Sequence, residues 1–228
     1  MPEIDSERVD NFVVPGIRVK RTDHEELVYT GLAGTVFLLA DSGWLALTAR
    51  HVAEGLVVGE TAVLFNRELG WQSAAVQGIE LHPTEDVAIL RLETGSYPSP
   101  FALSRSQEFA SSPYMLWGYP DAVLCEQVVH GEAFQRPSMV YSEGHIRRRL
   151  TDVPLDRPAG HRFYELSTVA GAGCSGSPVT VRRPGGQWRV IGVYTGERRS
   201  ESGDFAVGHA TRIADIDEDA ATWSRLFS

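Results

Sequence analysis

The sequence FYELSTVAGAGCSGSPV, residues 163–179, joins a strand-like apolar run to a glycine-rich turn, and a second run, WRVIGVYT, follows at residues 188–195. Gly173 and Gly176 leave the Ser175 hydroxyl uncrowded and permit a tight turn whose successive N–H groups point to one side. Paired N–H groups of this kind can form an oxyanion hole, which makes Ser175 a candidate nucleophile. The alternative interpretation of the segment is a hairpin loop rich in Ser and Gly.

Short apolar or alternating segments of the same kind recur along the chain, separated by Gly, Pro, Asp and Ser. Their spacing of about ten residues is typical of sandwiches and barrels, and no helical pattern suited to parallel crossovers lies between them. We therefore predict an all-β fold, whose strands include GTVFLLA (34–40), WLALTA (44–49), TAVLF (61–65), VAILRL (87–92), YMLWGY (114–119) and FAVGHATRI (205–213).

Two stretches depart from this pattern. In IADIDEDAATWSRLF, residues 213–227, apolar side chains recur at helical spacing, with acidic residues early and Arg225 late, which predicts a C-terminal helix. The segment at residues 94–113 is rich in Ser and Pro, and we interpret it as the connection between two halves of the chain.

Composition narrows the class of protein. With 228 residues, of which 43% are hydrophobic, the chain can bury a sizeable core, and its only cysteines, Cys125 and Cys174, are too few for a disulfide framework. The N-terminus MPEIDSERVDNF has no apolar signal region, so we expect a soluble cytoplasmic protein. A formal net charge of -9 argues against binding to nucleic acid or to an anionic membrane.

Two more candidate residues lie at strand ends. In WLALTARHVAEG, residues 44–55, an apolar strand ends just before His51, and in HPTEDVAILRL, residues 82–92, Asp86 opens a continuous apolar strand. Taken singly, such a His is usually a surface or packing residue, and such an Asp usually caps a turn. Together with Ser175, they supply a base and a base-orienting carboxylate for a nucleophile.

Three segments occur in one order along the chain: TARHV (48–52), DVAILRL (86–92) and GCSGSPV (173–179). They resemble the signature segments of the trypsin/chymotrypsin-like serine peptidases, and the resemblance covers roughly residues 30–213. It implies a serine endopeptidase with the catalytic triad His51, Asp86 and Ser175. It also implies two antiparallel six-stranded Greek-key barrels, with residues 1–105 forming the first, after an N-terminal extension, and residues 106–228 forming the second and the terminal helix.

The same resemblance assigns roles around the triad. The backbone N–H groups of Gly173 and Ser175 would form the oxyanion hole, and the strand from Gly192 to Gly196 would pair with substrate. The Thr195 hydroxyl would help to hold the aspartate. The resemblance implies seven substrate-binding residues, some in the pairing strand and some in the S1 pocket, which receives the side chain before the scissile bond: Val169, Ala170, Tyr194, Thr195, Gly196, Gly208 and Ala210.

The residues expected around the S1 pocket predict its preference. Val169 would lie at the base with Ala170 beside it, and strand alternation would turn Gly208 and Ala210 inward and His209 away. No acidic residue is expected at the base, so Arg and Lys substrates are disfavoured. Leu, Met or Phe would fit, unless Tyr194 shortens the pocket toward Ala or Val. Acidic specificity is the rival expectation, because Arg198, Arg199 and His209 lie near these strands.

Two departures from the family pattern affect activation. Members that are activated by proteolysis carry an aspartate just before the nucleophile, where this chain has Cys174, and the chain lacks an Ile-Val-Gly-Gly-type start. The resemblance is therefore to the bacterial members without disulfides, and we expect the intact chain to be active. Cys174 as the nucleophile is an alternative, although relatives that use cysteine place it where Ser175 stands.

Two other functions are compatible with parts of the sequence. An α/β-hydrolase would use the order Ser175, Asp204 and His209, but its G-x-S-x-G elbow is broken by Ser177 and its helix pattern is missing. A catalytically idle module used in protein binding or regulation is the main alternative. We expect no metal or organic cofactor and a protein or peptide substrate. We also expect restraint by a regulatory protein partner or by loop disorder, because an open peptidase in the cytoplasm would be hazardous.

Overall fold

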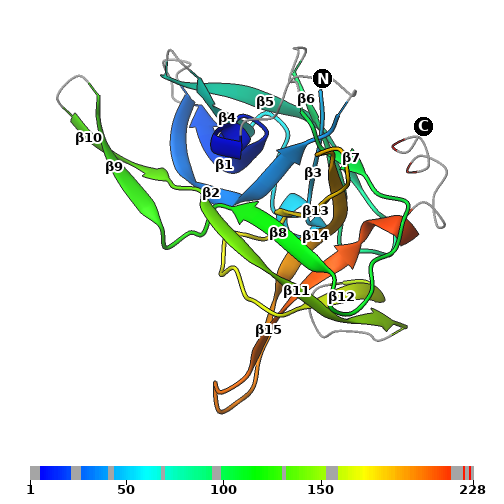
Figure 1. Ribbon diagram of the computed structural model, residues 1–228. Helices are drawn as coiled ribbons and strands as arrows, with labels where there is room; N and C mark the ends of the chain where they lie inside the picture. Colours follow the sequence, from blue (N-terminus) through cyan, green and yellow to red (C-terminus); the bar gives the residue numbers. More distant parts are fainter. Residues whose placement is uncertain are drawn as a thin grey trace.

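The computed structural model describes residues 6–21, 27–40, 44–67, 70–93, 99–129, 132–152, 159–216, 223 and 226. The strands form two closed antiparallel barrels that pack side by side (Figure 1). The predicted all-β, two-barrel fold is therefore confirmed, and each strand-like segment quoted above contains a strand. None of the helices in the described part of the chain has the length and apolar character needed to span a bilayer.

The first barrel closes in the order β1-β2-β3-β6-β5-β4. Its strands are β1 (Val13–Arg21), β2 (Leu27–Leu38), β3 (Leu45–Thr48), β4 (Thr61–Arg67), β5 (Gly70–Leu81) and β6 (Ala88–Leu92). A 3-10 helix, Ser6–Asn11, precedes β1, and the four-residue helix α1 (Arg50–Ala53) follows β3. In β6, four of five side chains are buried and only Arg91 is exposed, so the run predicted from its apolar residues lies inside the fold.

The second barrel closes because β13 pairs with both β8 and β14. Its strands are β8 (Pro113–Gly118), β11 (Val140–Thr151), β12 (Arg162–Leu166), β13 (Pro178–Arg182), β14 (Trp188–Arg199) and β15 (Ala206–Arg212). The two-residue strand β7 (Ala102–Leu103) adds to β14 in parallel. Strands β9 (Leu124–Val129) and β10 (Glu132–Pro137) form a separate hairpin that projects from the barrels (Figure 1).

One apolar cluster extends from the first barrel into the second. It joins Phe37, Leu47 and Leu90 to Trp188 and Val190 of β14, so the two barrels share a core at their junction. The predicted C-terminal helix falls mainly outside the described residues. Of the residues predicted to form that helix, Ile213–Asp215 form a 3-10 turn, and Trp223 is buried.

Candidate active site

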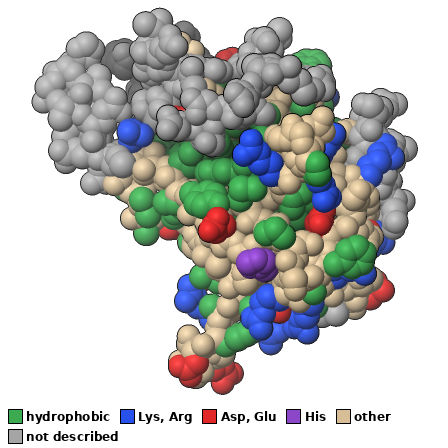
Figure 2. Space-filling view, in the orientation of Figure 1, with side chains coloured by type: hydrophobic (Ala, Val, Ile, Leu, Met, Phe, Trp, Pro, Cys, Tyr) green, Lys and Arg blue, Asp and Glu red, His purple; other side chains and the backbone are tan. Residues whose placement is uncertain are grey.

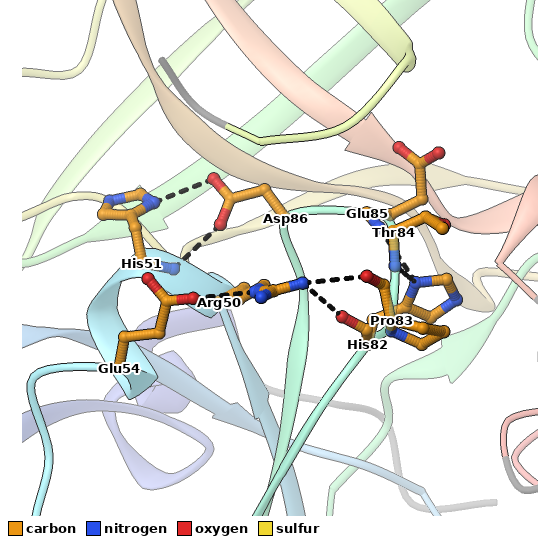
Figure 3. Close-up of polar contacts among 8 residues, drawn as sticks. All are labelled: Arg50, His51, Glu54, His82, Pro83, Thr84, Glu85 and Asp86. Atoms are coloured by element: carbon orange, nitrogen blue, oxygen red, sulfur yellow. Dashed lines mark hydrogen bonds and ion pairs between the residues drawn. The ribbon is translucent and has the colours of Figure 1, made fainter.

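His51 and Asp86 meet at the ends of neighbouring strands. His51 lies in α1 just after β3, Asp86 lies just before β6, and these strands pair Thr48 with Ala88. Asp86 Oδ1 accepts a hydrogen bond from the His51 backbone N–H at 2.9 Å, and Oδ2 lies 2.8 Å from His51 Nδ1 (Figure 3). Asp86 is fully buried, whereas 40% of the His51 side chain is exposed. Because a carboxylate only accepts, Nδ1 donates to it, and in the neutral imidazole Nε2 is left as an acceptor.

Arg50 fastens the loop that carries Asp86 to the helix that carries His51. Its Nη1 donates to the carbonyl oxygens of His82 and Pro83 at 2.8 and 3.0 Å, and its Nε donates to Glu54 Oε1 at 2.8 Å (Figure 3). The guanidinium thus spans both elements, and Glu54 holds it from the other side. The backbone before Asp86 is fixed relative to His51.

The second barrel and the C-terminal segment hold the same loop from its far side. His82 Nδ1 accepts the N–H groups of Thr84 and Glu85, and its Nε2 lies 2.9 Å from the carbonyl oxygen of Ile216. The buried Glu85 carboxylate accepts the backbone N–H groups of residues 161 and 162 at 3.1 and 3.3 Å. The loop that carries Asp86 is therefore held by residues of both barrels, although these residues are far apart in the sequence.

A threonine other than the expected one contacts Asp86. The Thr211 hydroxyl donates to the Asp86 backbone carbonyl at 3.3 Å. Thr195 instead donates to the carbonyl oxygen of His209 at 3.2 Å, so it does not hold the aspartate as the resemblance implied. Thr195 lies at an irregularity in the register of β14 against β15, between Tyr194 and Gly196.

The turn that carries Ser175 is fixed to β14. Cys174 N donates to Gly171 O at 3.2 Å, and Ser177 N donates to Cys174 O at 3.0 Å. Gly176 N then donates to Tyr194 O at 2.7 Å, and Tyr194 N donates to Ser177 O at 2.9 Å. Ser175 is half-buried and lies in a turn whose second half is already paired to a barrel strand.

The same turn docks on the first barrel through Thr35 and Thr48. Thr35 N donates to Ser175 O at 2.9 Å, and the Thr35 hydroxyl donates to Gly173 O at 3.0 Å. The Thr48 hydroxyl in turn donates to Thr35 O at 2.7 Å. Gly176 has a φ of 93°, and a β-carbon there would collide with Thr35 O and Thr48 Oγ1. Only glycine allows this close approach.

These contacts bring the Ser175 turn to the helix of His51. A β-carbon placed on Gly34 would lie 2.9 Å from the Val52 side chain and 3.1 Å from Ser175 O, so Val52 and Ser175 flank the same glycine. No hydrogen bond joins Ser175 Oγ to His51 in the described part of the chain. The backbone N–H groups of Gly173 and Ser175 likewise donate to no acceptor among the described residues, so both remain available to a bound oxygen.

Of the residues expected around the S1 pocket, Ala170, Tyr194 and Gly208 lie close together. Val169 and Ala170 are half-buried beside the Ser175 turn, and Gly208 and Ala210 are buried in β15. Tyr194 is 1% exposed, and its hydroxyl accepts the N–H of Ala170 at 3.0 Å. Burial raises the pKa of Tyr194, so the phenol stays neutral.

His209 belongs to the opposite face of β15. It is paired with Glu165 of the neighbouring strand β12, and its ring lies 6.4 Å from that of Phe163. Burial lowers the pKa of His209. Glu165 makes ion pairs with Arg147 and Arg148 at 3.6 and 2.8 Å. Basic side chains gather on the outer surface above the acidic tip of the β14–β15 hairpin (Figure 2).

Cys174 does not have the properties of a nucleophile. Its side chain is fully buried, and burial raises the pKa of its thiol to about 12, which keeps it protonated at neutral pH. It is a free thiol, while the side chain of Cys125 lies outside the described residues. Among the residues that the structure describes, no group of three or more His, Cys, Asp or Glu side chains could hold a metal ion.

Known proteins share both sequence and fold with this chain. A family model described as a trypsin-like peptidase domain matches residues 34–193. The chain belongs to the trypsin-like peptidase family. No curated protein matches it significantly. The predicted family is thus confirmed, and its two-barrel fold excludes the α/β-hydrolase alternative.

Solved structures of trypsin-like peptidases resemble the fold over nearly the whole chain. The inactive form of a serine-to-alanine mutant of Rv3671c from M. tuberculosis H37Rv has 17% identity and a TM-score of 0.62, covering 98% of this chain and 92% of that one. The MamO protease domain from Magnetospirillum magneticum has 15% identity and a TM-score of 0.65, covering 93% and 97%. The active form of the Rv3671c protease has 20% identity and a TM-score of 0.57, covering 93% and 81%.

Proposed function

We propose that this trypsin-like peptidase is a serine endopeptidase whose triad is His51, Asp86 and Ser175. The observation that carries the proposal is the double contact of Asp86, which accepts both the backbone N–H and the Nδ1–H of His51. A buried carboxylate in this arrangement fixes the tautomer of the imidazole and stabilises the imidazolium that forms during catalysis.

In this mechanism, His51 Nε2 takes the proton of Ser175 while Ser175 Oγ attacks the peptide carbonyl carbon. The resulting oxyanion accepts hydrogen bonds from the N–H groups of Gly173 and Ser175, which have no acceptor among the described residues. His51 then gives its proton to the leaving amine, and an acyl-enzyme remains on Ser175. A water molecule, activated by His51, hydrolyses this ester. In unliganded enzymes the contact between nucleophile and base is often loose and tightens when substrate binds.

An apolar residue before the scissile bond fits the surroundings of the proposed site. Ala170 and Ala210 pack in the same apolar cluster as Cys174 of the Ser175 turn, whereas the basic residues that favour an acidic substrate lie elsewhere. Arg198 and Arg199 are exposed near the end of β14, and His209 is on the face of β15 opposite to Ala210. We therefore favour the apolar preference over the acidic one.

Labelling with a fluorophosphonate tests the proposal directly. The intact chain is expected to be modified at Ser175, as located by mass spectrometry of tryptic peptides, and to cleave unfolded protein substrates. Labelling should not require removal of N-terminal residues. A folded protein that is neither labelled nor active would contradict the proposal and would support the idle binding module instead.

Substitution of the triad gives the second test. Ser175→Ala and His51→Ala should each lower kcat by about a million-fold, and Asp86→Asn by about ten-thousand-fold, while circular dichroism stays unchanged. The double variant Ser175→Ala/His51→Ala should lose little more than either single one, because the residues act as a unit. Near-normal activity of Asp86→Asn would show that another group orients His51.

A further inference from the structure

The position of the side chain before the scissile bond follows from the turn that carries Ser175. The attacked carbonyl must lie beside Ser175 Oγ with its oxygen at the N–H groups of Gly173 and Ser175. Two walls stand next to that point: the segment 168–171, which leads into the turn, and β14, which pairs with the turn through Gly176 and Tyr194. A substrate side chain that enters the second barrel from here has to pass between them.

Tyr194 already fills the space between these walls. Its backbone pairs with the Ser175 turn at Gly176 and Ser177, so its side chain starts beside the nucleophile. The ring belongs to the buried apolar cluster of the second barrel, together with Cys174 and Ala210. Its hydroxyl reaches the opposite wall, where it accepts the N–H of Ala170 at 3.0 Å. The side chain therefore spans the whole distance from β14 to the segment before the turn.

Gly208 shows how closely the remaining walls approach. A β-carbon placed on Gly208 would lie 2.6 Å from the carbonyl oxygen of Thr168 and 2.9 Å from Cε2 of Tyr194. No side chain at position 208 would fit between the tyrosine ring and the Thr168 backbone. The glycine thus makes room for Tyr194 and leaves no comparable room for a large side chain of a substrate.

We propose that Tyr194 occupies the site of the side chain before the scissile bond, so that the enzyme accepts only Gly, Ala or similarly small residues there. The inference rests on the proposed peptidase function and sets the size limit of its apolar preference. A larger substrate side chain would have to expel Tyr194, which would break its bond to Ala170 and expose a ring that is 1% accessible.

The test compares peptides that differ only in the residue before the scissile bond, which is Gly, Ala, Val, Leu or Phe. For the wild-type protein, kcat/KM for Ala is expected to exceed that for Leu or Phe by at least about tenfold. Tyr194→Ala should reverse this order, because removal of the ring opens the space for Leu and Phe. Tyr194→Phe should retain the preference for Ala, because the ring remains in place.

Tyr164→Ala is the matched control. Tyr164 is a fully buried tyrosine of the same apolar cluster, and its hydroxyl accepts the N–H of Glu108 at 2.8 Å. The substitution removes the same side chain from the same core and is expected to leave the order of substrates unchanged. A reversal in this variant as well would attribute the effect to general loosening of the barrel and would overturn the assignment of Tyr194.

The wild-type protein alone can refute the inference, even if the variants do not fold. Cleavage mainly after Leu, Met, Phe, Glu or Asp by a protein that a fluorophosphonate labels at Ser175 would contradict the role of Tyr194 and leave the peptidase function standing. Failure of that labelling in a folded protein would instead remove the peptidase function, and this inference with it. Small fluorophosphonates carry no peptide side chain, so their reaction does not depend on Tyr194.

Discussion

At the scale of single residues, Arg50 gives the clearest link between local geometry and the proposed chemistry. It touches neither the reacting atoms nor Asp86, but it binds the carbonyl oxygens of His82 and Pro83 at the start of the Asp86 loop. The spacing between His51 and Asp86 therefore depends on its planar, forked guanidinium. Arg50 is a positioning residue in this arrangement.

Replacing Arg50 should lower catalysis without weakening the binding of substrate. Arg50→Ala is expected to reduce kcat by about tenfold to a hundredfold, since a small displacement of a catalytic group has an effect of this size, with KM nearly unchanged. Arg50→Lys should not restore kcat, because an ammonium group lacks the planar fork that reaches both carbonyl oxygens and Glu54. Steady-state kinetics of both variants gives the measurement.

Glu54→Gln provides the control for this prediction. Its carboxylate is half-exposed and contacts the guanidinium only from outside, so a loss of kcat below about threefold is expected for a surface pair of this kind. A rise in KM in Arg50→Ala at constant kcat would assign Arg50 to substrate binding instead of to the alignment of His51.

The sequence indicated the residues of the proposed triad, but not the contacts that support them. A nucleophile, a base and a carboxylate at three strand ends form a recognisable combination, whereas Arg50 and Thr35 act on backbone atoms of distant segments. Arg50 and Thr48 both lie within the motif TARHV, and this adjacency to His51 was the available signal. Thr195, which donates to His209 O, lies at an irregularity in the register of β14, and no local pattern indicated this irregularity.

At the scale of elements, the Ser175 turn is built by its contacts with β2 and β3 of the other barrel. Thr35 of β2 binds both Ser175 and Gly173, and Thr48 of β3 supports Thr35. The backbone of Gly176 packs directly against this pair. The turn and the first barrel therefore form one unit around the candidate oxyanion hole.

Gly176→Ala should displace the turn and abolish activity. The new β-carbon would meet Thr35 O and Thr48 Oγ1, and the φ of 93° is itself unfavourable for alanine. We expect kcat/KM to fall by at least about a hundredfold and the free energy of unfolding to fall by about 2–4 kcal/mol. Kinetics and urea denaturation measure the two effects.

Gly203→Ala separates the collision from the backbone strain. Gly203 has a similar φ of 79°, but a β-carbon there would meet nothing within 4 Å. This variant should lose only about 1–2 kcal/mol of stability and keep its activity. Equal losses of activity in the two variants would contradict the proposed docking of the turn on Thr35 and Thr48.

The strands differ in how far local sequence predicted them. β3 and β6 are short, apolar and almost entirely buried, so their composition indicated them directly. β11 carries Glu143 and three consecutive arginines, and most of its side chains are exposed or half-buried. It is a strand because β8 and β12 pair with it on its two sides. The residues of β11 alone do not indicate this pairing.

At the scale of the whole molecule, the C-terminal segment ties the first barrel to the second. The ring of Trp223 lies 4.8 Å from that of His82 in an edge contact, and His82 Nε2 lies within hydrogen-bond distance of Ile216 O. His82 is in the loop that ends at Asp86. The last part of the chain thus packs against the support of the candidate active site.

Trp223→Ala should destabilise the whole protein. Its side chain is 1% exposed, and removal of a buried Trp side chain costs about 3–5 kcal/mol. Trp44→Ala, which changes a side chain that is 49% exposed, should lower the free energy of unfolding by about 0.5 kcal/mol or less. Denaturant unfolding of both variants makes the comparison, and similar costs would show that the C-terminal segment does not support the fold.

The pairing of Thr35 with the Ser175 turn has a consequence for synthesis of the protein. The Thr35 hydroxyl and Gly173 O lie 138 positions apart along the chain, and contacts of such long range pay a large loop-closure entropy. A ribosome that has translated only the first barrel has made His51 and Asp86 but neither Ser175 nor the turn that docks on Thr35. Products of premature termination before codon 175 therefore lack the proposed nucleophile, and nascent chains beside them on a polysome are not exposed to a partly assembled active site.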